Sequence, residues 1–161
     1  MRILTVRQPW AAAIIHAGKD VENRVRNIAG DYRGPVAIHA GARIPPIFDV
    51  ELFAHQHRGA FSDIIRGEGE EAVFGAIIGV VDLVDVHPAG REYELIGAGV
   101  SQITDRTCCG TWAMRDHYHL GLTNPRTLRT PIPYKGALGL RTLPDDVAAQ
   151  ITANLLTERS N

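Results

Sequence analysis

The chain has 161 residues with 17 basic and 18 acidic side chains, and its formal net charge is -1. Hydrophobic residues make up 45% of it, which is enough to bury the core of one domain. A net charge near zero argues against a protein that holds long nucleic acid by its phosphates. No apolar run reaches the length of a membrane span, and the N-terminus MRILTVRQPW lacks the apolar stretch of a signal peptide.

The near-neutral total conceals an uneven distribution of charge. Residues 1–43 carry seven basic and three acidic side chains, whereas residues 44–100 carry three basic and ten acidic ones. A locally positive N-terminal part can still bind a short strand or a single nucleotide. Only two of the 17 basic residues are lysines, Lys19 and Lys135. In a chain so biased towards arginine, each lysine is a candidate for a role that arginine does not fill.

The cysteines and histidines predict neither a disulfide framework nor a metal site. Cys108 and Cys109 are the only cysteines, and a bridge between adjacent residues strains disulfide geometry. They also lack the spacing of a zinc motif. The pairs HQH at 55–57 and HYH at 117–119 could each hold a metal from a strand, but neither has a third ligand nearby. We expect a cytoplasmic protein without metal or cofactor.

Short strands dominate the predicted secondary structure. The stretch AVFGAIIGVVDLVDV at residues 72–86 is the strongest strand signal, and Gly75 and Gly79 would allow bends or bulges in it. The three prolines of TNPRTLRTPIP exclude a central strand there. Trp112 is expected in the core, with stacking on a base as the alternative. The expected strands are Ile3–Val6, Asp20–Val25, Val36–Ala40, residues 72–86 and the shorter segments GTWAM, HYHL and KGALGLRTL.

Helices are expected at the two ends of the chain and in an insertion between Gly41 and Glu71. The first begins at Pro9, which suits a first helical turn, and stops at Gly18. The second begins near Pro46, and the last covers about residues 144–157, with two aspartates at its positive end. Together the elements predict an α+β fold, a small bent β-barrel with peripheral helices.

The stretch HAGKDVENRVRN places Lys19, Glu22 and Arg24 at the corner between the first helix and the following strand. If Val21–Val25 is extended, Glu22 and Arg24 share one face, and the valines share the other face towards the core. Lys19 can swing to the side of Glu22. The three charges then form either a surface ion pair of about 0–1 kcal/mol or a binding or catalytic site in a cleft.

The chain resembles the ASCH domain, a family in the PUA-like superfamily of small β-barrels. Its signature G-x-K-x-x-E-x-R matches at Lys19, Glu22 and Arg24, although the family glycine is replaced by Ala17 and a glycine follows at Gly18. The resemblance is carried by LTVRQPWAAAIIHAGKDVENR, YRGPVAIHAG, AIIGVVDLVDV and PIPYKGALGLRTLP.

The resemblance implies a single ASCH domain over residues 1–161, with a core at about residues 2–144. In ASCH-like proteins the signature lines a cleft implicated in binding RNA, DNA or a nucleotide. Some members hydrolyse the amide of cytidines that are acylated on the exocyclic amine. Bacterial members of that kind use a threonine nucleophile at the position of Glu22, whereas the branch with the R-Q-P-W/Y opening keeps glutamate there and is active on similar substrates.

A lysine and a carboxylate could cleave such an amide in two ways. Glu22 could be the general base towards a water while Lys19 stabilises the oxyanion, or a desolvated Lys19 could itself be the base. Arg24 would hold Glu22 or contact a phosphate. The other substrate-binding candidates are Gln8, Trp10, Arg7, Arg33 and His39.

Each of these candidates also has a structural interpretation. Trp10 could stack on a base or pack in the core, and Gln8 could contact a base edge or cap the helix. Arg7 and Arg33 could contact phosphates or be solvated, and His39 fits a satisfied, half-buried histidine. Two functions follow: an amidohydrolase acting on a modified nucleoside, or a non-catalytic reader of short single-stranded RNA or DNA. No membrane partner is expected, and nothing indicates a protein partner.

Overall fold

A mixed six-stranded sheet forms the centre of the described fold, seen here in a computed structural model. The structure describes residues 1–43, 51, 53, 54, 58, 73–89, 91–96, 99–104 and 109–155. In chain order the elements are β1 (Arg2–Val6), α1 (Trp10–His16), β2 (Val21–Arg24), β3 (Gly34–Ala40), β4 (Ala76–Pro88), β5 (Arg91–Ile96), β6 (Gly99–Thr104), the 3-10 turn η1 (Gly110–Trp112), β7 (Tyr118–Pro133), β8 (Leu140–Thr142) and α4 (Asp145–Asn154).

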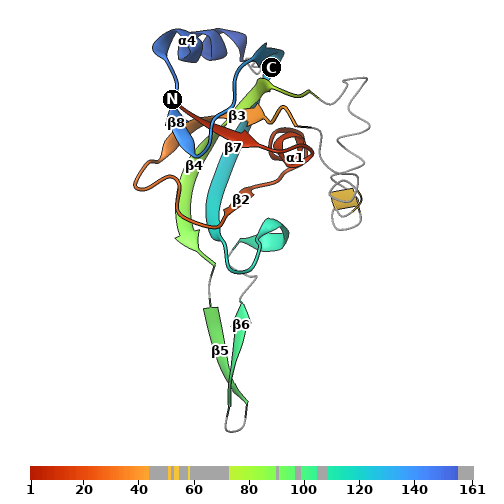
Figure 1. Cartoon of the computed structure of the whole chain (residues 1–161), viewed down its shortest axis with the longest axis vertical. Helices are drawn as coiled ribbons and strands as arrows, with labels where there is room; N and C mark the ends of the chain where they lie inside the picture. The colour runs from red at the N-terminus through yellow and green to blue at the C-terminus, as the bar shows by residue number, and fades with distance from the viewer. Residues whose placement is uncertain are drawn as a thin grey trace, which may run out of the picture.

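The sheet has the order β2-β7-β4-β3-β1-β8 and curves into a half-barrel (Figure 1). β1 and β3 run parallel, and the other neighbouring strands pair antiparallel. β2 and β8 lie at the two edges of the sheet. The predicted α+β fold with a bent sheet and peripheral helices is therefore present in this coarse form.

Apolar side chains are buried on both faces at the centre of the sheet. Along β1, Ile3 and Leu4 belong to different buried groups, and Ile77 and Ile78 on β4 divide in the same way. Because successive side chains of a strand point to opposite faces, the two groups lie on opposite faces of the sheet. Side chains of α1 belong to one group and Ile151 of α4 to the other. This burial on both faces explains why the first half of β4, residues 76–81, is continuously apolar instead of alternating.

The stretch TNPRTLRTPIP forms part of β7, a central strand of the sheet. The prediction that its prolines exclude a central strand is therefore wrong. β7 lies between β2 and β4 and contains Pro125, Pro131 and Pro133. The short β2 pairs only with Tyr118–Gly121, so within the described sheet the proline-bearing part of β7 has no strand on that side. On the other side, the register with β4 shifts where Pro125 lies. The missing N–H groups are tolerated at such positions.

Three other sequence predictions need correction. GTWAM is not a strand but the turn η1, because Asn23 binds the Trp112 carbonyl and the Met114 N–H in place of a strand ladder. Of KGALGLRTL, only the three residues of β8 are a strand. Val25 follows the last residue of β2 and is 81% exposed, so it does not join Val21 in the core.

The glycine predictions for β4 hold in part. The register of β4 with its neighbours shifts next to Gly79, which is the predicted bulge. A side chain at Gly79 would meet the Arg126 carbonyl oxygen and the Ile15 side chain, each at 2.7 Å, so this glycine also lets α1 approach the sheet. Gly75 precedes the strand and does not bend it.

The two described helices, α1 and α4, follow the predicted starts at Pro9 and Pro144. Neither is long and apolar enough to cross a membrane, and the same holds for every other helical residue described. The predicted helix near Pro46 and the acidic loop at residues 66–71 fall mostly outside the described residues. From residues 44–71 of this insertion the structure describes Glu51, Phe53, Ala54 and Arg58, all helical. The hairpin β5–β6, which was not predicted, extends away from one end of the half-barrel (Figure 1).

Candidate functional site

The side chains of Lys19, Glu22 and Arg24 converge. Lys19 Nζ lies 3.4 Å from Glu22 Oε2, and Arg24 Nη2 lies 3.0 Å from Glu22 Oε1. The carboxylate thus bridges two cations, one at each oxygen. The Lys19 side chain is 2% exposed and that of Glu22 11%, so the group is not the solvated surface pair that the spacing alone allowed.

The end of α1 directs Lys19 inwards. Gly18 adopts φ of 67°, a left-handed conformation that suits glycine, and the Lys19 N–H then donates to the Ala13 carbonyl oxygen at 3.0 Å. The Lys19 ammonium group donates a hydrogen bond to the Val21 carbonyl oxygen at the start of β2. A glycine directly before the lysine, one position later than in the ASCH signature, is therefore what turns the chain here.

Burial makes the Lys19 amine easier to deprotonate. Desolvation lowers the pKa of the Lys19 amine from its ordinary value, and the charge and hydrogen bond of Glu22 oppose that effect. The ring of Trp112 has its centroid 5.7 Å from Lys19 Nζ, a distance at which the ring face attracts a cation. Chemically, such an amine can serve as a charged hydrogen-bond donor or, once deprotonated, as a base.

Arg24 ties Glu22 to β1 and retains an unused donor. Its Nη2 donates to the Thr5 carbonyl oxygen at 2.9 Å as well as to Glu22. Its Nε is buried and has no hydrogen-bond partner in the described part of the chain. A buried donor without a partner costs about 1–3 kcal/mol, and such a group in a folded protein calls for an explanation, a functional role among others.

Aromatic rings extend from Lys19 towards α1. Trp112 stacks on Phe53 with ring centroids 6.2 Å apart and an interplanar angle of 30°. Phe53 in turn meets Trp10 edge to face at 5.8 Å. Asn23 on β2 holds the turn that carries Trp112, because its Nδ2 donates to the Trp112 carbonyl oxygen and its Oδ1 accepts from the Met114 N–H, both at 2.9 Å.

The sequence did not reveal Asn23 as a site residue, and for Trp112 it favoured the core over a stacking role. Trp112 was expected in the core, yet it is half-buried and its ring lies over the Lys19 amine. Nothing in the segment GTWAM indicated Lys19 as the neighbour of this ring.

Gln8 and Trp10 lie at the start of α1 and have contacts within the fold. Gln8 Oε1 accepts from the Ala12 N–H at 3.1 Å, and Gln8 Nε2 donates to the Val73 carbonyl oxygen at 2.9 Å. The capping interpretation of Gln8 is therefore confirmed. Trp10 is half-buried and packs against the core group that contains Ile14, in addition to its contact with Phe53.

His39 is 1% exposed and so is more deeply buried than expected. Its Nε2 lies 2.9 Å from the Tyr134 carbonyl oxygen, while its Nδ1 has no partner among the described residues. The backbone at Gly136 passes so close that a Cβ there would lie 2.6 Å from the imidazole ring. These neighbours of His39 do not include Lys19, Glu22 or Arg24, so the structure does not bring it into their group.

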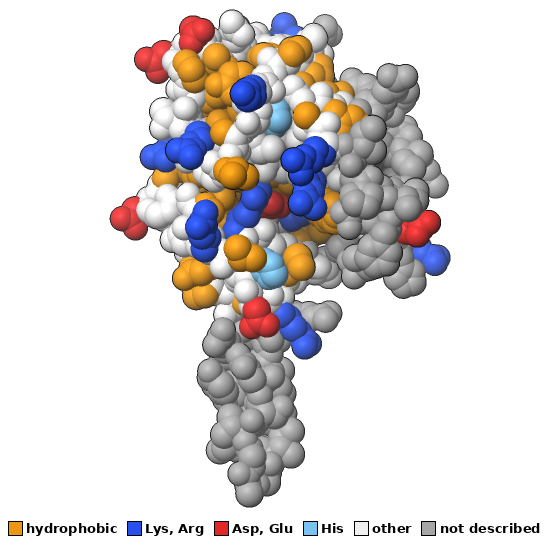
Figure 2. All heavy atoms as spheres, in the orientation of Figure 1, with side chains coloured by type: hydrophobic (Ala, Val, Ile, Leu, Met, Phe, Trp, Pro, Cys, Tyr) orange, Lys and Arg blue, Asp and Glu red, His pale blue; other side chains and the backbone are white. Residues whose placement is uncertain are grey.

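Arg7 and Arg33 are exposed. Arg33 Nη1 donates to the carbonyl oxygens of Gly30 at 3.2 Å and Tyr32 at 2.8 Å, in the turn between β2 and β3. Figure 2 shows basic side chains gathered across the middle of one face of the molecule around an acidic side chain. This local excess of positive charge is what contacts with phosphate would require, and those contacts stay a prediction.

A shallow depression of about 200 Å³ reaches Lys19 from the side of β7. Its described lining includes Lys19 but not Glu22 or Arg24. The lining consists of Ile14, Gly18, Lys19, Asp20, Val81, Leu122, Thr123 and Pro125.

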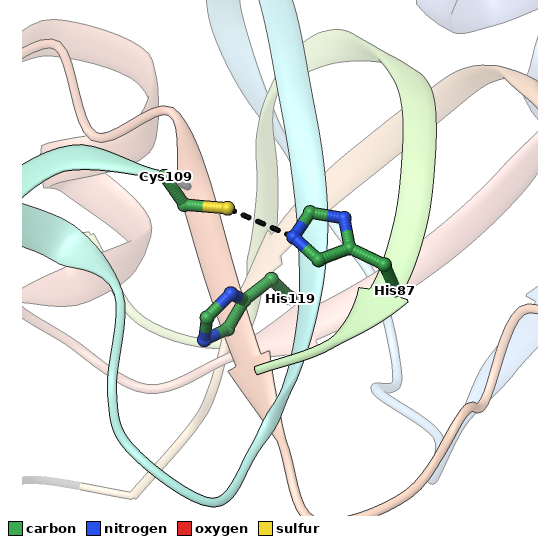
Figure 3. Close-up of side chains that lie close together, drawn as sticks. All are labelled: His87, Cys109 and His119. Carbon is green, nitrogen blue, oxygen red and sulfur yellow. Dashed lines mark hydrogen bonds between the residues drawn. The ribbon is translucent and has the colours of Figure 1, made fainter. Parts of the chain in front are cut away.

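A second group of reactive side chains lies near the start of β7, where His119 meets His87 and Cys109 (Figure 3). Their nitrogen and sulfur ligand atoms all lie within 4.8 Å of one another. The HYH pair was predicted to lack a third ligand because neither His87 nor Cys109 is close to it in sequence. In the folded chain both are close to His119.

The lowered pKa of Lys19 predicts how stability depends on pH. Between the lowered pKa of Lys19 in the folded state and the ordinary lysine pKa of 10.5, the unfolded chain binds more protons at this site than the folded one. The free energy of unfolding therefore rises with pH across that window, and the cost of burying the charge is largest below it. We expect the wild type to gain stability relative to Lys19→Met as pH rises from neutral towards 10.5, measured by urea unfolding at each pH.

Taking the difference in unfolding free energy between the wild type and Lys19→Met cancels the contributions of other titrating groups that both proteins share. Burial raises the pKa of Tyr32, which on its own lowers stability as pH rises above 10.0, but Tyr32 is present in both proteins. A difference in unfolding free energy that does not change with pH would contradict the prediction.

Comparison with known proteins adds no assignment: no family model matches this chain, and no curated protein matches it.

Proposed function

We propose that the half-barrel is an ASCH domain of the PUA-like type, and that its site binds a modified nucleoside and hydrolyses the amide of cytidines acylated on the exocyclic amine. The observation that carries the proposal is the buried Lys19 amine, which is paired with Glu22 and lies under the ring of Trp112. The sequence signature at Lys19, Glu22 and Arg24 supports the family, and the order of strands and helices is compatible with it.

The chemistry is the addition of water to an acyl carbonyl. Glu22 removes a proton from water as the hydroxyl oxygen bonds to the carbonyl carbon, and Lys19 stabilises the oxyanion that forms. The bond from the carbonyl carbon to the exocyclic nitrogen then breaks, and Glu22 returns its proton to that nitrogen. The products are cytidine and a carboxylic acid. Arg24 positions Glu22 through the contact at 3.0 Å.

The roles of Lys19 and Glu22 can also be exchanged, and the burial of Lys19 makes the pH profile decisive. If the charged Lys19 stabilises the oxyanion, the rate falls as pH rises through its lowered pKa. If neutral Lys19 is the base, the rate rises through the same pKa. A profile of kcat/KM against pH therefore assigns the two roles.

The charge of the chain favours a nucleoside over a long strand. The net charge of -1 supplies no extended basic surface for many phosphates. A non-catalytic reader of a short single strand is the second candidate, favoured by the basic side chains gathered on the face in Figure 2.

Incubation with N4-acetylcytidine, followed by chromatography of the nucleosides, tests the proposal. We expect cytidine to accumulate in proportion to enzyme concentration, at a rate that barely changes between 50 and 200 mM salt, because the substrate is uncharged. A reader that makes about three phosphate contacts with a single strand would lose roughly tenfold or more in affinity over that range. No cytidine from N4-acetylcytidine, together with salt-sensitive binding of a short oligonucleotide, would favour the reader.

A further inference from the structure

His87, Cys109 and His119 come from three different parts of the chain and face a common space (Figure 3). His87 on β4 and His119 on β7 are paired across the two antiparallel strands, so their side chains lie on the same face of the sheet. Their rings meet edge to face with centroids 5.4 Å apart. Cys109 precedes η1, and its Sγ lies 3.0 Å from His87 Nε2.

Each imidazole is also held from its far side. His87 Nδ1 lies 2.6 Å from Asp85 Oδ2, and His119 Nε2 lies 2.8 Å from the Met114 carbonyl oxygen. Histidines that bind metals usually donate their other ring N–H to a carboxylate or a backbone carbonyl, which fixes the tautomer and the orientation of the ring. Both kinds of partner are present here. They direct His87 Nε2 and His119 Nδ1 towards the Cys109 sulfur.

We infer that His87, Cys109 and His119 form a binding site for a divalent transition metal ion, with Zn²⁺ the best match to the ligands. One thiolate and two neutral imidazoles are a donor set that zinc accepts in tetrahedral sites, and a site with three protein ligands leaves the fourth position for water or another ligand. This inference does not depend on the proposed function.

The distances are compatible with a metal after a small adjustment. Bonds of about 2.0–2.1 Å to nitrogen and about 2.3 Å to sulfur place the ligand atoms of a tetrahedral zinc roughly 3.5 Å apart. The hydrogen-bonded pair at 3.0 Å would open slightly, and ligand atoms that are up to 4.8 Å apart would close by about 1 Å. Rotation of the side chains is sufficient for changes of this size.

The alternative is a thiol nucleophile, since Asp85, His87 and Cys109 follow one another in the order of a carboxylate, imidazole and thiol triad. One observation favours the metal: His119 adds a third donor that such a triad does not use.

A metal would fasten the turn that carries Trp112. Cys109 immediately precedes η1, whose last residue is Trp112, and Met114 just beyond it is bonded to both Asn23 and His119. A bond from a metal to Cys109 would therefore tie the N-terminal end of this segment to β4 and β7. The metal would have a structural role and would hold the Trp112 ring in place.

Titration of the full-length, tag-free, reduced protein with Co²⁺ after removal of bound metal by EDTA tests the site. We expect one equivalent of Co²⁺ to produce the near-ultraviolet band of a thiolate–cobalt bond and the visible bands of tetrahedral cobalt, and Zn²⁺ to displace both. Cys109→Ser should abolish the near-ultraviolet band, whereas Cys108→Ser, which removes the neighbouring thiol, should retain it. Asp85→Asn should keep the spectrum and weaken affinity by about 10–100-fold.

Circular dichroism of each variant establishes that it is folded before its spectrum is compared. His119→Ala should lose the tetrahedral spectrum, and His117→Ala serves as the matched control that retains it. Zn²⁺ should raise the midpoint of thermal unfolding of the wild type and not that of Cys109→Ser. Absence of the thiolate–cobalt band in the wild type, or its persistence in folded Cys109→Ser, would overturn the inference.

Discussion

Glu22→Gln and Lys19→Ala are each expected to lower the rate of acylcytidine hydrolysis by about 10²–10⁴-fold, the usual contribution of a positioned acid or base. Glutamine keeps the shape of Glu22, and its single carbonyl oxygen can still accept a hydrogen bond from Lys19 or from Arg24, but it cannot take a proton from water. The measurement is kcat/KM on N4-acetylcytidine, followed by chromatography, with a thermal unfolding curve for each variant.

Lys19→Arg separates the two roles of the lysine, because arginine keeps the positive charge but cannot act as a base at ordinary pH. If Lys19 stabilises the oxyanion, Lys19→Arg should retain more activity than Lys19→Ala. If Lys19 is the base, the two variants should be equally inactive. Full activity in both Lys19→Ala and Glu22→Gln, with the proteins folded, would rule out this chemistry.

Ile151→Ala is expected to lower the free energy of unfolding by about 2–5 kcal/mol, the usual cost of truncating a fully buried isoleucine. Ile151 is 0% exposed and joins α4 to the face of the sheet formed by Ile77, Val80 and Leu128. The change leaves a cavity between α4 and the sheet, far in sequence from the charged site. Urea unfolding monitored by circular dichroism measures the loss.

Gln150→Ala is the matched control, since Gln150 is the preceding residue of the same helix and is exposed. Its unfolding free energy should stay within about 0.5 kcal/mol of the wild type. At a temperature where Ile151→Ala is folded, its kcat/KM should equal that of the wild type. Substitution of Ile151 should thus lower stability alone, whereas substitution of Lys19 should lower activity. A loss of less than about 1 kcal/mol in Ile151→Ala would show that α4 is not packed as described.

The sequence was most informative where structure is local. Pro9, the helical spacing after it and Gly18 marked α1, and the β-branched run marked β4, because both signals depend on residues within a few positions of each other. The charged trio could be anticipated for the same reason. A short extended segment places Glu22 and Arg24 on one face, and a glycine turn brings Lys19 beside them.

Local signals failed at β7 and at GTWAM, where a distant partner decides the conformation. The prolines of β7 are acceptable only because β2 is short and the register with β4 shifts at Pro125, and neither fact is visible in the proline-rich segment. In the same way, Asn23 captures the Trp112 carbonyl and turns a strand-like segment into η1. Secondary structure here follows the hydrogen-bond partner and not the propensity.

Composition and spacing alone were sufficient for an α+β fold with a bent sheet and for placing Glu22 and Arg24 on one face of a strand. Only the tertiary structure decided that Lys19 is buried under Trp112, and that His87 and Cys109 lie beside His119. The physical reason is that strand pairing joins residues that are remote in the chain. The antiparallel register of β4 and β7 sets His87 opposite His119, and no pattern within either strand contains that register.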